Sequence, residues 1–272
     1  MVQTVITPPG RFSAPNLREM WNAREVLYRF GMRDIVLRYR QTAVGVVWVL
    51  LQPLVSAGIF SIVFGQVAGL SSDGKPYFIF SFVGMLAWNL FSQVLNRSAG
   101  SMVGSQALIS KVYFPRILVP LSGILSVFVD FVIALGLCIV LLFVYGINPG
   151  WPVLLLPLWA VLIALLGAGL GLAASAIMVR YRDVAYVLPW LVQTLMFASP
   201  VAYSVSDVPS NLTTLFNLNP LAWFLDLFRW SLLGTPAPEP WKFVGAVVVS
   251  LVVLTWGMFV FQKFEREFAD VI

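Results

Sequence analysis

The stretch of sequence that decides the fold lies at residues 117–145 and reads ILVPLSGILSVFVDFVIALGLCIVLLFVY. It contains a single charged residue, Asp130. A helix rises about 1.5 Å per residue, so roughly 20 residues cross the hydrocarbon core of a bilayer. The stretch is long enough to cross as one helix, and it predicts an integral membrane protein.

The composition of the 272 residues supports this prediction. Of these residues, 60% are hydrophobic and 11% are charged, whereas a soluble domain carries about 25% charged residues. The net charge of +5 comes from basic residues beside apolar runs, which is typical of a membrane protein and not of a nucleic-acid-binding face. The absence of histidine excludes histidine-based catalysis and histidine metal sites. The single cysteine, Cys138, excludes a disulfide within these residues.

Hydrophobic runs of helical length predict six transmembrane helices in an all-α, polytopic fold. The expected spans are residues 43–68, 77–94, 117–145, 153–179, 184–199 and 243–261. The fifth span is short because Pro200 ends it. The fourth carries Gly167, Gly169 and Gly171, and small residues at such spacings let helices approach closely.

Two further segments are predicted to be helical without crossing the membrane. Residues 16–30 indicate an amphipathic helix that lies in the membrane interface and is ended by Gly31. Residues 220–234 indicate a helix that is capped by Asn219 and has Pro220 at its first position. At the usual rise per residue it is about 21 Å long, which is too short to cross comfortably. We therefore expect a re-entrant helix there.

The distribution of basic residues predicts the orientation of the chain. With six crossings and a cytoplasmic N-terminus, 14 of the 17 lysines and arginines lie on the cytoplasmic side, in agreement with the positive-inside rule. The exceptions are Lys75, Arg229 and Lys242. Both termini are therefore expected in the cytoplasm, and residues 220–234 are not expected to cross.

The sequence carries no recognisable catalytic motif. It has no phosphate-binding loop of the form GxxxxGK[ST], and no GxSxG, HExxH or CxxC. The chain is therefore expected not to be an enzyme, and to bind no metal or cofactor of its own. A transporter without these motifs takes its energy from a separate ATPase subunit or from an ion gradient.

Ion coupling needs ionisable groups at membrane depth, and three such residues are present. Asp226 and Arg229 lie three residues apart and are expected to form an ion pair. Asp130 has no partner nearby in the sequence. Its carboxylate has two interpretations: a structural one, as a hydrogen bond to a neighbouring helix or a group facing a vestibule, and a functional one, as a proton relay.

Four motifs carry a resemblance to a known family. They are RDIVLRYRQTAVGVVWVLLQPL at residues 33–54, LISKVYFPR at residues 108–116, the pair Arg182-Asp183, and Asn219-Pro220 before an apolar helix. In order and spacing they resemble the ABC-2 type permeases that export polysaccharide, such as O-antigen, teichoic acid or galactan.

The resemblance implies an assembly, a cargo and a location. Two copies would form a homodimer beneath which two ABC ATPase subunits, the holders of ATP and Mg²⁺, would bind. The cargo would be a polysaccharide on undecaprenyl or a related lipid pyrophosphate. The complex would lie in the bacterial cytoplasmic (inner) membrane, with both termini cytoplasmic. The alternatives are an ABC-2 permease for a drug or a lipid, and a proton-coupled carrier centred on Asp130.

The resemblance also implies roles for parts of the chain. Residues 1–42 would be a cytoplasmic tail with an amphipathic gate helix, 43–262 the transmembrane domain, and 263–272 a cytoplasmic tail. The region between the fifth and sixth spans would form re-entrant gate helices. A coupling helix at about 100–113 would contact the ATPase, through the candidates Ser105, Leu108, Ile109, Lys111 and Tyr113.

Two further groups of residues are candidates for contact with the cargo. Aromatic rings stack on the apolar faces of sugars and tolerate a sliding polymer, although an interfacial aromatic belt is the alternative interpretation. The candidates for lining a channel are Tyr77, Phe78, Phe80, Trp88, Phe91, Phe197, Tyr203, Trp223, Phe224 and Trp230. The basic residues Arg33, Arg38 and Arg40 are candidates for binding a pyrophosphate headgroup, with a positive-inside anchor as the alternative.

Overall fold

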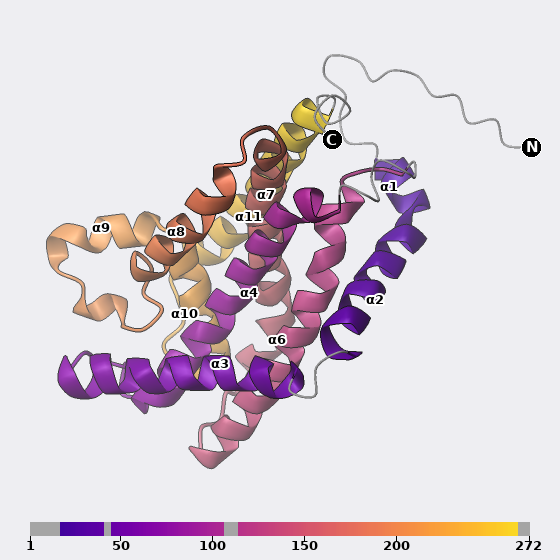
Figure 1. Ribbon diagram of the computed structural model, residues 1–272. Helices are drawn as coiled ribbons and strands as arrows, with labels where there is room; N and C mark the ends of the chain where they lie inside the picture. Colours follow the sequence, from indigo (N-terminus) through magenta and orange to yellow (C-terminus); the bar gives the residue numbers. More distant parts are fainter. Residues whose placement is uncertain (1–16, 41–44, 106–113, 266–272) are drawn as a thin grey trace, which may run out of the picture.

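The computed structural model describes residues 17–40, 45–105 and 114–265, and within these ranges the fold is all-helical, as the sequence predicted. Figure 1 shows the helices and their order along the chain. They are α1 (Leu17–Asn22), α2 (Arg24–Arg40), α3 (Gly45–Phe60) with a π-helical continuation (Ser61–Val67), α4 (Tyr77–Gly104), α6 (Leu118–Val144), a short 3-10 helix (Trp151–Leu155) leading into α7 (Leu156–Arg180), α8 (Val184–Phe197), a 3-10 turn (Val205–Asp207), α9 (Ser210–Leu218), α10 (Pro220–Leu233) and α11 (Pro240–Glu265).

Five of these helices are long and apolar enough to cross a membrane, which confirms a polytopic membrane protein. They are Val47–Val67, Tyr77–Gly104, Leu118–Val144, Trp151–Arg180 and Pro240–Glu265. The expected fifth span corresponds to α8, which has 14 residues and is apolar but shorter than the others. A sixth crossing through α8 therefore remains a prediction.

Two expected boundaries differ from the structure. The second span was expected to end at residue 94, but α4 continues to Gly104, because no proline interrupts it. Gly31 was expected to end the amphipathic helix, but α2 runs through it without a break. The interruption lies instead at Ala23, between α1 and α2. Gly31 is buried, and its missing side chain serves packing, not termination.

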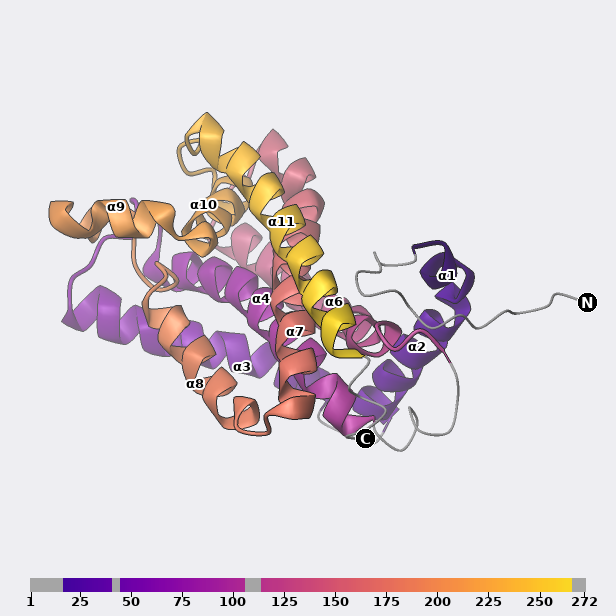
Figure 2. The same ribbon diagram turned by 90° about the horizontal axis from the view of Figure 1, so that it is seen from above.

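Helix α4 forms the centre of the bundle. In its most apolar window 83% of the residues are buried, against 11% for Val47–Val67 and 17% for α11. It packs along α6 and α7, and α10 lies against it from the other side. Figure 2 shows α8 and α9 on one side of this bundle and α1 and α2 on the opposite side, as Figure 1 does. The less buried helices, α3 and α11, therefore expose apolar side chains that lipid can cover.

Helix α3 has an unusual position for an expected first span. Figure 1 shows it crossing α4 and α6 instead of running beside them. Ala57 is buried at its contact with the bundle, while Trp48, Val55 and Ile59 are at least half exposed. This apolar surface has to be covered by lipid or by another protein chain.

Glycines on α7 bring three helices into close contact, as the small-residue pattern predicted. A Cβ atom placed on Gly171 would lie 2.6 Å from the Cβ of Ser98 on α4, and one on Gly167 would lie 2.9 Å from the carbonyl oxygen of Phe91. On the opposite side, a Cβ on Gly169 would lie 2.5 Å from the carbonyl oxygen of Val253 on α11. These backbones touch because side chains are missing between them.

We predict that Gly169→Val destabilises the fold, because the added atoms must push α11 away from α7. Overpacking of this kind costs about 1–3 kcal/mol. Thermal unfolding of the purified chain in detergent measures the loss. Gly136→Val on α6 is the matched control, since a Cβ there meets no atom within 4 Å. Equal unfolding midpoints for the two variants would contradict the proposed close contact.

Candidate functional site

The structure gathers ionisable groups into three places: a cluster in the middle of α6, a cavity beside it near Arg33, and a cluster at the opposite end of the bundle. The first depends on how α2 docks. Gly31 lies directly on α6, and a Cβ placed there would be 3.1 Å from the Cβ of Leu125 and 3.2 Å from the carbonyl oxygen of Ser122. This contact brings the last turn of α2 to the buried centre of α6.

Asp130 finds its partners on α2. Its carboxylate is buried and lies 2.8 Å from Nη2 of Arg38, with which it forms an ion pair. The hydroxyl of Tyr39 donates a hydrogen bond to the other carboxylate oxygen. Burial, and then this hydrogen bond, raise the pKa of Tyr39 to about 12, so its hydroxyl keeps the proton that it donates. Through these two contacts, Asp130 attaches α2 to α6.

A cavity of about 330 Å³ borders this ion pair, between α2, α3, α4 and α6. Amide side chains from α3 and α4 line it together with the charged pair, namely Gln52, Asn89 and Gln93. Trp48 and Phe131 supply apolar walls. The mixture of amides and aromatic surface is of the kind that binds polar organic ligands.

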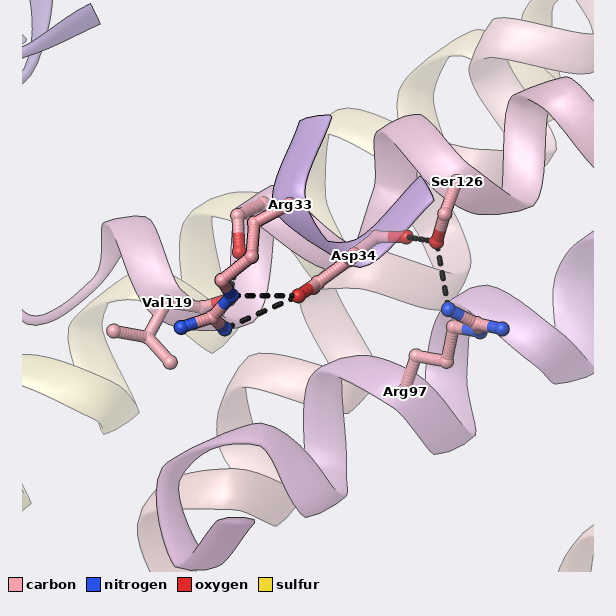
Figure 3. Close-up of polar contacts among 7 residues, drawn as sticks. Arg33, Asp34, Arg97, Val119 and Ser126 are labelled. Carbon is pink, nitrogen blue, oxygen red and sulfur yellow. Dashed lines mark hydrogen bonds and ion pairs between the residues drawn. The ribbon is translucent and has the colours of Figure 1, made fainter. Parts of the chain in front are cut away.

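The three headgroup candidates do not converge on one point. Arg38 is engaged by Asp130, and Arg40 is exposed at the end of α2. Arg33 is half exposed, and its Nη2 lies 3.1 Å from Oδ1 of Asp34. Arg33 borders a different cavity from Arg38. Figure 3 shows polar residues at this second cavity, where Asp34 of α2 points toward Arg33, and Arg97 of α4 points toward Ser126 of α6.

The expected ion pair between Asp226 and Arg229 does not form. Asp226 instead lies 3.0 Å from Nζ of Lys242 at the start of α11. The spacing on α10 allowed the local pair, but the fold places a lysine from another helix beside the carboxylate and aims Arg229 the other way.

Arg229 is fully buried and holds the segment that follows α8. Its Nη2 donates to the carbonyl oxygens of Pro200 and Val201 at 2.8 and 2.9 Å. Its guanidinium also lies over the ring of Phe80, 3.8 Å from the centroid. These partners, together with the carbonyl oxygen of Tyr203 that accepts from Nη1 at 3.4 Å, take the place of a carboxylate.

Other bonds secure the same segment to α4. The hydroxyl of Tyr77 donates to the carbonyl oxygen of Ala202 at 2.5 Å. Gly84 makes room for this approach, since a Cβ there would clash with the carbonyl oxygen of Val201. Ser204 then donates to Asp73 at 2.7 Å, which joins this segment to the turn before α4.

The aromatic candidates divide into two groups. Five are core residues of the bundle, at most 8% exposed: Phe80, Trp88, Phe91, Phe224 and Trp230. They pack against neighbouring helices of the chain, which leaves almost none of their surface open to a polymer. The other five are partly or largely exposed, namely Tyr77, Phe78, Phe197, Tyr203 and Trp223. Contact with a polymer stays a prediction for this second group.

The five candidates for contact with the ATPase fall just after α4 in the sequence. Leu108, Ile109, Lys111 and Tyr113 lie outside the described residues. Ser105 follows the last residue of α4 and borders the cavity of Arg33. The first part of the expected coupling helix, from residue 100 to 104, is the end of α4.

Three residues that sequence reasoning passed over belong to these clusters: Tyr39, Arg97 and Lys242. Tyr39 lies within the motif at residues 33–54, and Arg97 lies just after the predicted second span, but neither was assigned a role. Lys242 was counted as an exception to the positive-inside distribution. Its position beside the last apolar run was the available signal, because a lysine that becomes buried at a helix end needs a charged partner.

A bundle of long apolar helices with a docked N-terminal helix defines a polytopic membrane protein. The family model for ABC-2 type transporters matches residues 26–233, and the chain belongs to this family. It is a transport subunit of the kind that carries no ATPase domain in the matched region.

Proteins of known description share most of the chain's length. It is 28% identical to the O-antigen export system permease protein RfbA of Myxococcus xanthus, over 94% of this chain and 98% of that protein. It is 24% identical to a protein of the same name from Klebsiella pneumoniae, over 88% and 92%. It is also 24% identical to the polysialic acid transport protein KpsM of Escherichia coli, over 86% and 92%.

We predict that the Arg38–Asp130 pair couples α2 to α6. Arg38→Gln and Asp130→Asn should each lower hydrogen-exchange protection of α2, and the double variant should be little worse than either one. The coupling energy should be about 1–2 kcal/mol, as for contacting charged groups. Arg29→Gln is the control, because its pair with Glu25 is exposed and lies within α2. Strictly additive losses would show that the two residues do not interact.

We predict that Arg229→Lys loosens the segment from residue 200 to 203. A lysine keeps the charge but lacks the planar group that bonds several carbonyls and stacks on Phe80. Unfolding stability should fall by about 2–4 kcal/mol, with faster proteolysis after α8. Arg182→Lys, at an exposed turn position, should change neither. Unaltered proteolysis of Arg229→Lys would refute the anchoring role.

Proposed function

We propose that the chain is the membrane-spanning permease subunit of an ATP-driven exporter that moves lipid-linked polysaccharide across the bacterial cytoplasmic membrane. The observation that carries this proposal is the likeness, over most of their lengths, to proteins named for export of O-antigen and transport of polysialic acid. Family membership supports the transport role. ATP and Mg²⁺ belong in this proposal to a partner ABC ATPase, since residues 1–272 contain no phosphate-binding loop.

The proposed topology has six crossings with both termini in the cytoplasm. Helix α8 supplies the short fifth crossing, and α9 and α10 return within the outer half of the membrane. Three features of α10 support a half-length helix: it has 14 residues, Asn219 caps it by accepting from Leu221, and Gly234 ends it in the left-handed conformation. It begins and ends within the span of the bundle, against α4.

The proposed division of the chain follows this topology. Residues 1–42 form the cytoplasmic tail and gate helix, 43–262 the transmembrane domain, and 263–272 a second cytoplasmic tail. We assign the gate role to α2, which docks on α6 at Gly31 and through the Arg38–Asp130 ion pair. The segment between α4 and α6 is proposed to contact the ATPase.

A pair of such chains is proposed to enclose the channel. The support is the exposed apolar surface on α3, including Trp48 and Ile59, and on α8, including Tyr186 and Trp190. In this proposal, lipid covers the part of this apolar surface that the second copy does not bury. The exposed aromatic candidates, among them Phe197 and Tyr203, are proposed to meet the polymer at the outer side.

The export role is tested in the organism that carries this chain. A strain that lacks the chain should lose its surface polysaccharide and accumulate lipid-linked polymer inside the cytoplasmic membrane, and expression of the chain should restore export. The purified chain should bring with it an ABC ATPase whose activity depends on the pair. Normal surface polysaccharide in the deletion strain would reject the cargo, and the absence of an ATPase partner would reject the energy source.

We predict that locking α2 to α6 stops export. The geometry at Gly31 and Leu125 is close to that of a disulfide, whose Cβ atoms lie roughly 3.5–4.5 Å apart. Gly31→Cys together with Leu125→Cys, in a Cys138→Ala background, should export normally when reduced and lose most export when oxidised. Each single cysteine variant should be insensitive to oxidant. Full export by the cross-linked protein would show that α2 is not a gate.

A further inference from the structure

A cavity of about 350 Å³ lies between α2, the last turns of α4 and the first turns of α6. Figure 3 shows its polar centre, where side chains from three helices face one another. The residues that matter here are Arg33 and Asp34 on α2, and Asn96, Arg97 and Gly100 on α4. It is separate from the cavity beside Asp130, and none of the motifs that indicated the family includes Arg97.

Arg97 brings a positive charge to the cavity, and its side chain donates to a neutral hydroxyl. Its Nη1 donates to Oγ of Ser126 at 2.6 Å, and that hydroxyl donates onward to the carbonyl oxygen of Gly123 at 2.8 Å. Within the described ranges no carboxylate lies at ion-pair distance from Arg97. A guanidinium has five N–H donors, so donors remain for a further acceptor.

Arg33 adds a second guanidinium from the facing helix. Its Nε and Nη2 both bond to Oδ1 of Asp34, at 3.3 and 3.1 Å. Both bonds therefore use one carboxylate oxygen, and they hold the guanidinium at the edge of the cavity, over the ring of Phe30. Two arginines and one aspartate give the cavity a net charge of +1, which favours an anion.

The position of the cavity indicates where that anion comes from. Arg97 lies near the end of α4 that the positive-inside rule assigns to the cytoplasm, where the hydrocarbon meets the headgroups. The cavity lies between a docked helix and two spanning helices, which is a place where a headgroup could bind while its lipid chain stays in the membrane. Arginine forks match phosphate oxygens in geometry as well as in charge.

We propose that this cavity binds the phosphoryl group of a lipid, with Arg97 and Arg33 as its principal donors. The proposal deepens the export function and rests on it, since a lipid-linked cargo carries such a group where lipid and sugar join. Asp34 orients Arg33, and Asn96 is within the lining to donate its amide. Because α2 forms one wall, an occupied site also links the cargo to the position of the gate helix.

The glycines of the wall provide a way to test the site without removing its charges. A Cβ placed on Gly100 or Gly104 meets no atom within 4 Å, so a larger side chain there enters empty space. Gly100→Leu therefore fills the cavity while leaving Arg33 and Arg97 in place. It also replaces a glycine in a helix, which favours folding by about 1 kcal/mol.

Binding is measured on the full chain in maltoside micelles, from the rise in its unfolding temperature with added probe. The probes are farnesyl diphosphate, inorganic diphosphate and farnesol. Farnesyl diphosphate should stabilise the chain saturably, and the other two should do so weakly. Arg97→Gln and Arg33→Gln should each weaken apparent affinity about ten-fold, as for loss of a charge-assisted hydrogen bond. Gly100→Leu should abolish binding, and Arg182→Gln should leave it unchanged.

Three results would overturn the proposal. Unchanged affinity in Gly100→Leu or Arg97→Gln would place the ligand elsewhere. Equal affinity for inorganic diphosphate would show a site for free phosphate, and equal affinity for farnesol would show that the phosphoryl group is not recognised. Surface polysaccharide is scored separately in cells. Loss of export on deletion, with binding unaffected by Arg97→Gln, rejects the site alone; binding through Arg97, with export intact on deletion, rejects the function alone.

Discussion

The close approach of α7 to α4 and α11 is the contact on which the rest of the structure depends. In lipid the hydrophobic effect gives helices little reason to associate, so backbone-to-backbone packing has to supply the attraction. Gly167 and Gly171 meet α4, and Gly169 meets α11. With these three helices joined, α6 and α10 have fixed surfaces to pack against. The polar clusters then sit at the margins of this unit, where α2 and the segment after α8 attach.

Each attachment uses charge in a different way. Helix α2 is held by a carboxylate and an arginine that can separate, with Tyr39 as a third partner. The segment after α8 is held by Arg229, whose partners are backbone carbonyls and a ring. Arg38 is partly exposed, so separation of the first pair gives its guanidinium access to other partners. Arg229 cannot exchange its partners in this way, because its side chain is buried on every side. The partly exposed ion pair therefore allows α2 to move, whereas the buried Arg229 fixes the segment after α8.

Much of this fold was predictable from hydrophobic length and local helix chemistry. The long spans, the cap at Asn219 and the small residues of α7 all follow from properties of single helices, and the structure confirms them. The partners of Asp130 and Asp226 were not predictable, because Arg38 and Lys242 come from other helices and their approach depends on packing. The prediction that Gly31 ends the helix was wrong for the same reason. In the sequence, a glycine that ends a helix cannot be told from a glycine that lets one helix pack closely on another.

The short length of α10 has a consequence for how the protein is made. Fourteen residues that include Asp226 and Arg229 are too few and too polar to be released into lipid as a span of their own. The surfaces that bury α10 belong to α4 and α7, and Lys242 arrives with α11. We therefore expect α10 to enter the membrane last, after α11 has inserted, as a tertiary folding step and not as a product of translation order.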